Sequence, residues 1–269
     1  MANSGTGDSV VDRVVRVIAA FPEGVTVLPL SELAGRADLP LSTAHRLVRQ
    51  LAGHGLLELG SGGSVRLGLR LWELVNRNSP TLALRQAAMP FMEDIQQVLN
   101  QNVNLAVLEG GEALFVERLS RRGSVANRAR VAGRMPVHLS SVGLALMANQ
   151  PSAVQTKYVR QFHDPAGKVQ PEEIRALLDE AAGCGFAQLA GVVDPDTWGI
   201  AVPVRDAGNR TVAALGVVVP LREMRLQALV PALQTAARGI GRQLQNPEPA
   251  MHAIQRNSSN APHVAGRTL

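Results

Sequence analysis

The chain has 269 residues and a net charge of +5, and 46% of its residues are hydrophobic, so we expect two domains that each bury a core. The single cysteine, Cys184, excludes an internal disulfide and fits a reducing cytoplasm. No apolar run approaches the roughly 20 residues that cross a bilayer, and the small, polar N-terminal stretch is not a secretory signal, so we expect a cytoplasmic protein without a membrane partner.

Three helices followed by a hairpin are expected near the N-terminus. Val10–Ile18 follow helical spacing, Ser31 suits the N-cap of a short second helix, and Pro40 suits the first position of a third. After the third helix, two short β-prone stretches flank the glycine-rich tip Gly60–Gly63, which is typical of a hairpin. This order predicts a winged helix-turn-helix domain over residues 8–68.

The remainder predicts a linker helix and a larger mixed domain. Residues 69–79 have helical spacing and end before a proline, whereas residues 80–246 interleave helices with strands and contain two hairpin signals. Val125–Val131 is expected to form one of those strands. Residues 247–269 are rich in Pro, Asn, Ser and Gly, which predicts a disordered tail. The fold class is therefore α+β, with a largely antiparallel sheet flanked by helices.

The third helix has the layout of a helix that reads DNA. Its polar side is centred on Ser42, Arg46 and Arg49, with Thr43 and His45 beside them. Short side chains near the helix start can enter the major groove, where arginines reach guanine edges or phosphates, and the first backbone N–H groups can bind a phosphate. An ordinary amphipathic helix with a solvated face is the alternative. The opposite, buried stripe consists of Ala44, Leu47, Val48 and Leu51.

The charges limit where a polyanion can bind. Residues 1–78 contain eight arginines against seven acidic residues, so affinity for DNA there depends on where the arginines point. Arg66, just after the hairpin tip, is a candidate phosphate or minor-groove contact, or else a solvated strand residue. The densest basic stretch, Arg118–Arg134 with six arginines, is either a solvated surface or a rim that attracts anions.

The order and spacing of these motifs resemble the isocitrate-lyase-regulator (IclR) family of bacterial transcription factors over about residues 8–245. In the N-terminal part, the matching segments are Leu30–Ala34, Asp38–Leu47, Leu51–Glu58 and Val65–Gly68. In the larger domain they are Leu105–Gly110, Arg134–Gly143, Ile200–Val204 and Leu215–Pro220.

The resemblance implies a winged helix-turn-helix, a linker helix and a GAF-like effector-binding domain. It further implies a homodimer or homotetramer that binds a palindromic double-stranded DNA operator and responds to a small-molecule effector. Repression of the target genes is expected rather than activation. Leu41 departs from the family, which often carries a basic residue there, and this departure weakens a phosphate contact. By family position, the DNA contacts are Ser42, Thr43, Ala44, His45 and Arg46.

The resemblance also locates an effector pocket. Family pockets use backbone N–H groups at the positions of Ser141, Val142 and Gly143, together with polar side chains from the last two strands. The corresponding strand positions here offer few hydrogen bonds, so we expect a rather apolar or aromatic effector, or none. Asn127 and Ser141 are the polar candidates that remain. The strand positions are Trp198, Gly199, Ala201, Gly216 and Val218, of which Trp198 is alternatively a loop residue packed on the surface.

Catalysis is the competing explanation. A cysteine nucleophile would need Cys184 beside His138 or His163, and Cys184 lies in a glycine-flanked turn where most cysteines are inert. The histidines lack metal-ligand spacing, and the glycine-rich tip lacks the lysine of a phosphate-binding loop. We therefore expect no enzyme, metal or cofactor. The alternative is a GAF-like small-molecule-binding protein or hydrolase whose N-terminal module serves dimerisation.

Overall fold

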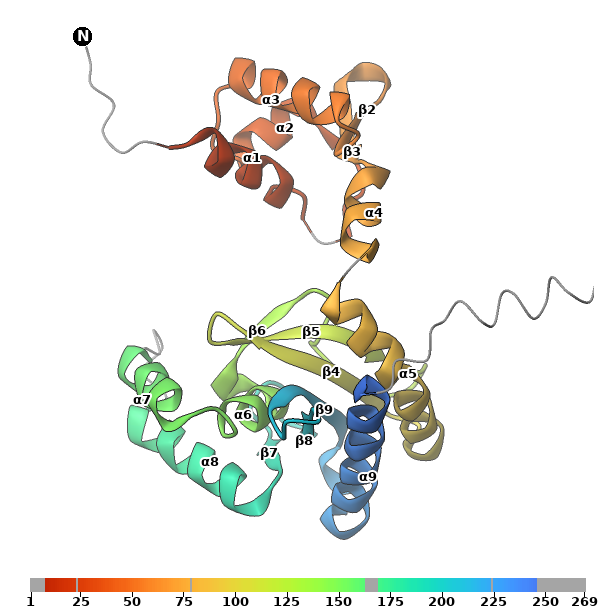
Figure 1. Cartoon of the computed structure of the whole chain (residues 1–269), viewed down its shortest axis with the longest axis vertical. Helices are drawn as coiled ribbons and strands as arrows, with labels where there is room; N and C mark the ends of the chain where they lie inside the picture. The colour runs from red at the N-terminus through yellow and green to blue at the C-terminus, as the bar shows by residue number, and fades with distance from the viewer. Residues whose placement is uncertain (1–7, 23, 78, 163–168, 224, 246–269) are drawn as a thin grey trace, which may run out of the picture. The chain divides into compact units, whose positions relative to one another are not determined.

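The chain divides into two compact units, Met1–Ser79 and Pro80–Leu269 (Figure 1). The computed structural model describes residues 8–22, 24–77, 79–162, 169–223 and 225–245. The tail predicted over residues 247–269 lies outside the described residues, as does His163. The predicted α+β class is confirmed, because the first unit is mainly helical and the second is built around an antiparallel sheet.

Helices and a small sheet form the first unit. Its helices are α1 (Val10–Ala19), α2 (Leu30–Arg36), α3 (Leu41–Gly53) and α4 (Leu69–Arg77), and its strands are β1 (Leu28–Pro29), β2 (Leu57–Leu59) and β3 (Ser64–Leu67). The strands are hydrogen-bonded in the order β1-β3-β2. A core that includes Val17, Leu33 and Leu47 joins the first three helices to this sheet.

Two helix starts differ from the sequence prediction. Ser31 does not cap α2, because the helix begins one residue earlier, at Leu30, and Pro29 occupies the N-cap without a side-chain hydrogen bond. Pro40 is the N-cap of α3 and not its first helical residue, since its ψ of 141° is still extended. The tight turn between α2 and α3 is present, with Asp38 at a φ of +52°.

The predicted hairpin is confirmed as a wing after α3. Strands β2 and β3 pair antiparallel, and the tip between them contains Gly62 and Gly63 at positive φ, a conformation that costs glycine little. Gly68 ends the wing in close contact with the loop after α3, because its N–H donates to the Leu56 carbonyl at 2.8 Å. A Cβ at Gly68 would lie 2.0 Å from the Gly55 carbonyl oxygen, so no larger residue fits there without backbone movement.

The second unit is a six-stranded antiparallel sheet with the order β6-β5-β4-β9-β8-β7. The strands are β4 (Asn102–Glu109), β5 (Glu112–Leu119), β6 (Arg134–Pro136), β7 (Ala187–Ala190), β8 (Thr197–Arg205) and β9 (Thr211–Pro220). The helices are α5 (Pro80–Leu99), α6 (Ser141–Met147), α7 (Ser152–Gln161), α8 (Pro171–Cys184) and α9 (Leu226–Gln245).

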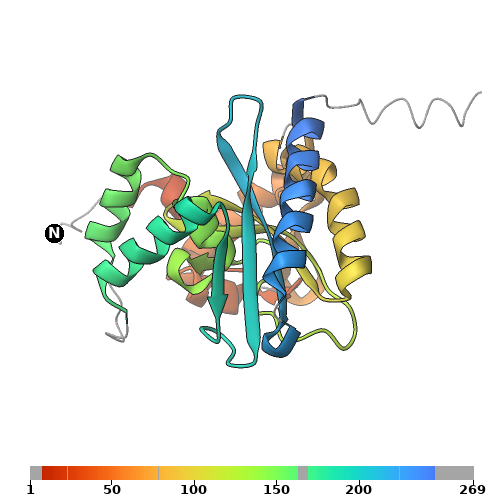
Figure 2. The same cartoon turned by 90° about the horizontal axis from the view of Figure 1, so that it is seen from below.

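Helices cover both faces of this sheet. In Figure 2, α5 and α9 lie on one side of the strands, and α6, α7 and α8 lie on the other. Side chains of a strand alternate between the two faces. Along β8, Trp198 and Ile200 therefore join the core under α5 and α9, whereas Ala201 joins the core under α6.

The strand predicted over Val125–Val131 is wrong. The 120–133 segment, which connects β5 to β6, has no regular secondary structure, and the short strand β6 follows it at Arg134–Pro136. Side chains of the sheet take the place of a ladder partner: the Asn102 Nδ2 donates to the Val125 carbonyl at 2.8 Å, and the Arg118 Nη1 donates to the Ala129 carbonyl at 2.7 Å.

Candidate functional site

Helix α3 presents a polar face to solvent and an apolar stripe to the core. The stripe of Ala44, Leu47, Val48 and Leu51 is buried, as its helical spacing predicted. Ser42, His45, Arg46 and Arg49 are exposed, and Thr43 is half-buried. Neither arginine forms a hydrogen bond or ion pair with a residue that the structure describes, so both guanidinium groups are available to a partner.

Two of the predicted DNA contacts, Ala44 and Arg66, are less accessible to a duplex than the exposed residues of α3. Ala44 is 0% exposed, so its methyl group packs inside the unit and cannot be offered to a duplex. Arg66 is exposed on β3, but it forms an ion pair with Glu58 across the wing, with its Nη2 at 2.5 Å from the carboxylate. That pair holds the Arg66 guanidinium close to the wing, whereas Arg46 and Arg49 have no such restraint.

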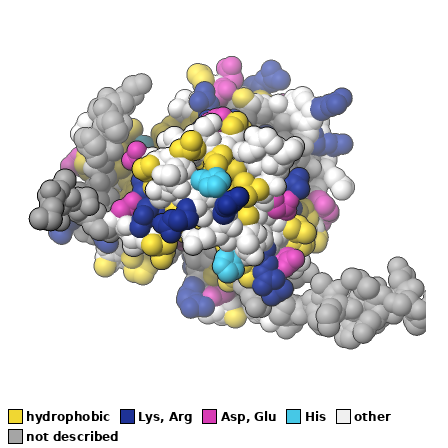
Figure 3. All heavy atoms as spheres, turned by 90° about the horizontal axis from the view of Figure 1, so that it is seen from above, with side chains coloured by type: hydrophobic (Ala, Val, Ile, Leu, Met, Phe, Trp, Pro, Cys, Tyr) yellow, Lys and Arg dark blue, Asp and Glu magenta, His cyan; other side chains and the backbone are white. Residues whose placement is uncertain are grey.

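The surface of the first unit is mixed and not uniformly basic. Figure 3 looks onto the side where α3 lies, and it shows basic side chains interspersed with acidic, histidine and hydrophobic ones; all the basic residues of the first unit are arginines. This agrees with the nearly balanced charges of residues 1–78. Any polyanion bound there is held by a few placed arginines and not by a continuous positive field.

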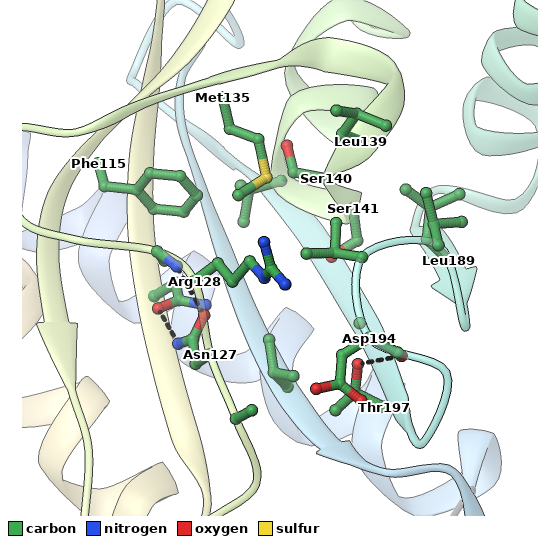
Figure 4. A pocket seen from close by; sticks show the side chains of 18 residues that line it. Phe115, Asn127, Arg128, Met135, Leu139, Ser140, Ser141, Leu189, Asp194 and Thr197 are labelled. Carbon is green, nitrogen blue, oxygen red and sulfur yellow. Dashed lines mark hydrogen bonds between the residues drawn. The ribbon is translucent and has the colours of Figure 1, made fainter. Parts of the chain in front are cut away.

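A pocket lies in the second unit, on the α6 side of the sheet. The 120–133 segment forms one wall, the start of α6 forms another, and strands β8 and β9 with the loop before β8 complete it (Figure 4). Its volume is about 70 Å³. The lining residues are Asn104, Phe115, Ala126, Asn127, Arg128, Ala129, Met135, Leu139, Ser140, Ser141, Val142, Leu189, Val192, Val193, Asp194, Thr197, Gly199 and Val218.

Half of the predicted effector residues line this pocket. Asn127, Ser141, Val142 and Val218 do, together with Gly199, which the sequence placed among the strand positions. Trp198 does not: it is 1% exposed and belongs to the core under α5 and α9, on the opposite face of the sheet.

The other three predicted positions also lie outside the pocket. Gly143 is inside α6, and its N–H is already taken by the Ser140 Oγ at 3.0 Å. Ala201 and Gly216 are paired across β8 and β9, farther along these strands and under α6. A Cβ at Gly216 would lie 2.7 Å from Cγ1 of Val142, so this glycine permits α6 to contact the sheet and does not contact a ligand.

Five polar pocket residues were missed by the sequence analysis: Asn104, Arg128, Ser140, Asp194 and Thr197. The Arg128 side chain extends into the space between Phe115 and Ser141 (Figure 4). Arg128 lies in the basic stretch that the sequence did single out, so a charge signal existed, although nothing in it specified the pocket. Asp194 comes from the loop before β8 and Thr197 is the first residue of that strand, where the Thr197 Oγ1 donates to the Asp194 carbonyl at 2.9 Å.

Two polar groups of residues that line the pocket have no partner among the described residues. Asn104 is 4% exposed, and its Oδ1 accepts from the Asn127 Nδ2 at 2.9 Å, but its Nδ2 forms no hydrogen bond with a described residue. Ser141 is 8% exposed, and its hydroxyl likewise has no such partner. Both groups can therefore form hydrogen bonds with a ligand or with water in the pocket.

Other site chemistry is not found in the described part of the chain. Cys184 is exposed at the end of α8 and forms no hydrogen bond with a described residue. No three His, Cys, Asp or Glu side chains of the described residues are placed to hold a metal ion. None of the described helices combines the length and apolar character that crossing a bilayer requires.

The chain combines a winged helix-turn-helix with a sheet domain whose small pocket is lined by polar and apolar residues. This combination defines the class of DNA-binding regulators that carry a ligand-binding domain. Residues 10–60 match the IclR helix-turn-helix domain, and residues 79–242 match the C-terminal domain of the bacterial transcriptional regulator IclR. The chain therefore belongs to the IclR family of transcriptional regulators, which are not enzymes. The sequence resemblance is confirmed, and the hydrolase alternative is set aside.

Similar proteins are found among solved structures and characterised regulators. An IclR homologue from Microbacterium hydrocarbonoxydans, complexed with 4-hydroxybenzoate, is 43% identical, covers 88% of this chain and 99% of its own, and has a TM-score of 0.82. An IclR homologue from Microbacterium sp. strain HM58-2 is 41% identical over 89% of this chain and 99% of its own, with a TM-score of 0.57. The HTH-type transcriptional regulator XynR of Escherichia coli is 25% identical over 210 residues, which are 76% of this chain and 83% of XynR.

Proposed function

We propose that the protein is a cytoplasmic, homo-oligomeric regulator that binds a palindromic operator through α3 and the wing and responds to a small aromatic acid in the pocket. The observation that carries the DNA part is the exposed face of α3. Its two arginines have no partner among the described residues, while its apolar side is fixed in the core beside the wing. The first N–H groups of α3 are not capped by a side chain, which suits a phosphate.

Binding to duplex DNA tests this proposal directly. Inverted repeats are first selected with the full chain from a randomised duplex library and then titrated by fluorescence anisotropy. We expect a Kd of roughly 10⁻⁸ M or tighter at physiological salt, and a steep loss of affinity as salt rises. The same titration with 4-hydroxybenzoate, the compound bound by the Microbacterium hydrocarbonoxydans homologue, should weaken binding if the protein is a repressor released by its ligand. Recovery of no preferred repeat would contradict the proposal.

A second copy of the chain is the partner we propose for α4. None of the described residues of this nine-residue helix is buried, and Leu69, Trp72 and Val75 form an exposed apolar stripe at helical spacing. Trp72 alone is 64% exposed. An exposed apolar stripe on a helix is typical of an interface, and a twofold dimer would bury it and match a palindromic operator.

Trp72→Lys should weaken self-association of the full chain by at least about tenfold, because each desolvated interface aromatic contributes about 2 kcal/mol or more. Sedimentation velocity over a concentration series measures the change. Leu74→Lys adds the same charge to α4 roughly opposite Trp72, and it should leave the association constant unchanged. Equal effects of the two substitutions, or none, would contradict this interface.

The pocket supports an aromatic acid as the ligand. Phe115, Met135 and Leu189 supply apolar walls, the Arg128 guanidinium can pair with a carboxylate, and the Asp194 carboxylate can accept from a hydroxyl group. The sequence analysis predicted a rather apolar or aromatic effector but did not anticipate the charged residues. The homologue that is 43% identical holds 4-hydroxybenzoate, which has this combination of groups, and we adopt it as the trial ligand.

Arg128→Ala should weaken 4-hydroxybenzoate binding about tenfold, as expected for one charge-assisted hydrogen bond that is partly screened by water. Isothermal titration calorimetry of the full chain measures the affinity. Arg122→Ala is the matched control, because Arg122 is also exposed in the 120–133 segment but does not line the pocket. If the two variants bind equally well, Arg128 does not hold the carboxylate.

A further inference from the structure

The pocket is too small, as it stands, for the ligand class we propose. Its volume of about 70 Å³ leaves room for only a few water molecules. Pockets that enclose small-molecule ligands typically measure roughly 300–1,000 Å³. The Arg128 side chain also occupies part of the space between the walls (Figure 4). An aromatic ring can therefore enter only if one wall of the pocket moves.

The 120–133 segment is the wall attached with the least apolar contact. Ala129 is its only buried side chain, and the residues around it are exposed or half-buried. The α6 wall, by contrast, is buried along its whole length, from Ser141 to Met147. Moving α6 would expose seven buried residues of its own, whereas Ala129 is the segment's single buried side chain and its other groups are already in part solvated.

Polar side chains of the sheet hold the middle of this segment in place. Asn102 binds the Val125 carbonyl, Arg118 binds the Ala129 carbonyl, and the Asn104 Oδ1 accepts from the Asn127 Nδ2 at 2.9 Å. The Asn127 Oδ1 in turn accepts from the Ala129 N–H at 3.0 Å. Each such bond contributes little net free energy, because water replaces it when the segment opens.

We propose that the 120–133 segment is a lid over the pocket and that Asn104 is the positioning residue that latches it through Asn127. This inference rests on the proposed function of the pocket and adds how that site opens and closes. Asn104 is suited to the role because it lies on β4, is buried, and has an Nδ2 group still free for an acceptor on the ligand. The lid would close over a bound ligand in an arrangement wider than the ligand-free one. A ligand held by both Asn104 on the sheet and Arg128 on the lid favours that arrangement over the open one, since it makes both contacts only when the lid covers it.

Hydrogen exchange of the full chain, read by mass spectrometry, tests the lid. The reporter is the Val125 amide, which donates to the Gln101 Oε1 at 3.3 Å and not to Asn104 or Asn127. In the ligand-free protein it should exchange faster than the amides of β4. Asn104→Ala should speed its exchange roughly fivefold or more, because the latch is lost. Asn104→Asp keeps an oxygen acceptor for the Asn127 Nδ2, so it should restore slow exchange while weakening 4-hydroxybenzoate binding through charge repulsion.

Asn149→Ala is the matched control, since its amide also donates to a backbone carbonyl, that of Ala145 at 2.8 Å, but it does not touch the lid. It should leave Val125 exchange unchanged, and α9 exchange should be unchanged in every variant if the fold is intact. Wild-type protein at ten times the Kd of 4-hydroxybenzoate should show Val125 exchange slowed about tenfold.

The outcomes separate this inference from the proposed function. If 4-hydroxybenzoate does not bind the wild type, the proposed ligand is wrong, and the ligand-free comparison of wild type with Asn104→Ala still decides the latch. If Val125 exchanges as slowly as β4, or if Asn104→Ala leaves its exchange unchanged, the lid is overturned. Ligand that binds without slowing Val125 exchange also overturns it.

Discussion

Trp198→Ala will lower the free energy of unfolding of the second unit by about 3–5 kcal/mol, the cost of deleting a large buried aromatic side chain. Trp198 is 1% exposed and packs with Ile200 and Val202 in the core under α5 and α9. The loss corresponds to a melting temperature lower by roughly 6–20 °C for a unit of this size. Denaturant unfolding followed by far-ultraviolet circular dichroism measures it.

The chain contains its own control, because Trp72 is the only other tryptophan and is 64% exposed on α4. Trp72→Ala should change the unfolding free energy by no more than about 0.5 kcal/mol when measured on the dissociated chain. Trp198→Ala that retained stability but lost affinity for 4-hydroxybenzoate would place Trp198 in the pocket, as the sequence analysis supposed, and would contradict the alternation of side chains along β8.

Arg46→Ala should raise the Kd for the selected operator about 5- to 150-fold for each half-site, which corresponds to about 1–3 kcal/mol for a guanidinium that reads a base edge. Arg46 is exposed near the middle of α3 and has no partner among the described residues, so the substitution removes no contact that holds the unit together. The loss should be larger for the selected operator than for random duplex, since base contacts give specificity and phosphate contacts do not.

Arg77→Ala removes the same charge from α4, where Arg77 is 3.7 Å from the Glu73 carboxylate. Its effect on operator affinity should be small, and this comparison distinguishes a placed contact from a change in net charge. Equal losses for Arg46→Ala and Arg77→Ala would show that only overall charge matters, and would remove α3 as the reading helix.

Local periodicity was sufficient for much of the first unit. The apolar residues of α3 recur at helical spacing, and the structure buries all four of them. The glycine-rich tip also predicted the wing correctly, because its glycines permit the positive φ of the turn. Helix starts were less reliable: the extended Pro29 and Pro40 are the N-caps, whereas the sequence suggested Ser31 as the cap of α2 and Pro40 as the first residue of α3.

The pocket was predicted less well, for two physical reasons. The strand positions taken from the resemblance included both Trp198 and Gly199, although neighbouring residues of a strand face opposite sides of a sheet and cannot both line one pocket. Arg128 and Asp194 come from loops that are far apart in the sequence, and no local pattern pairs them. The irregular path of the 120–133 segment depends on Asn102, Asn104 and Arg118 in distant strands, so its local β propensity was misleading.

The alternation along β8 and β9 has an evolutionary consequence. Even-numbered positions of β8 such as Trp198 and Ile200 maintain the hydrophobic support of the fold, while Gly199 and, across from it, Val218 border the pocket. A substitution at Gly199 or Val218 would alter the proposed ligand site, whereas one at Trp198 or Ile200 would disturb the core. Paralogues can thus diverge toward new signals by altering Gly199 and Val218, with the row under α5 and α9 left untouched.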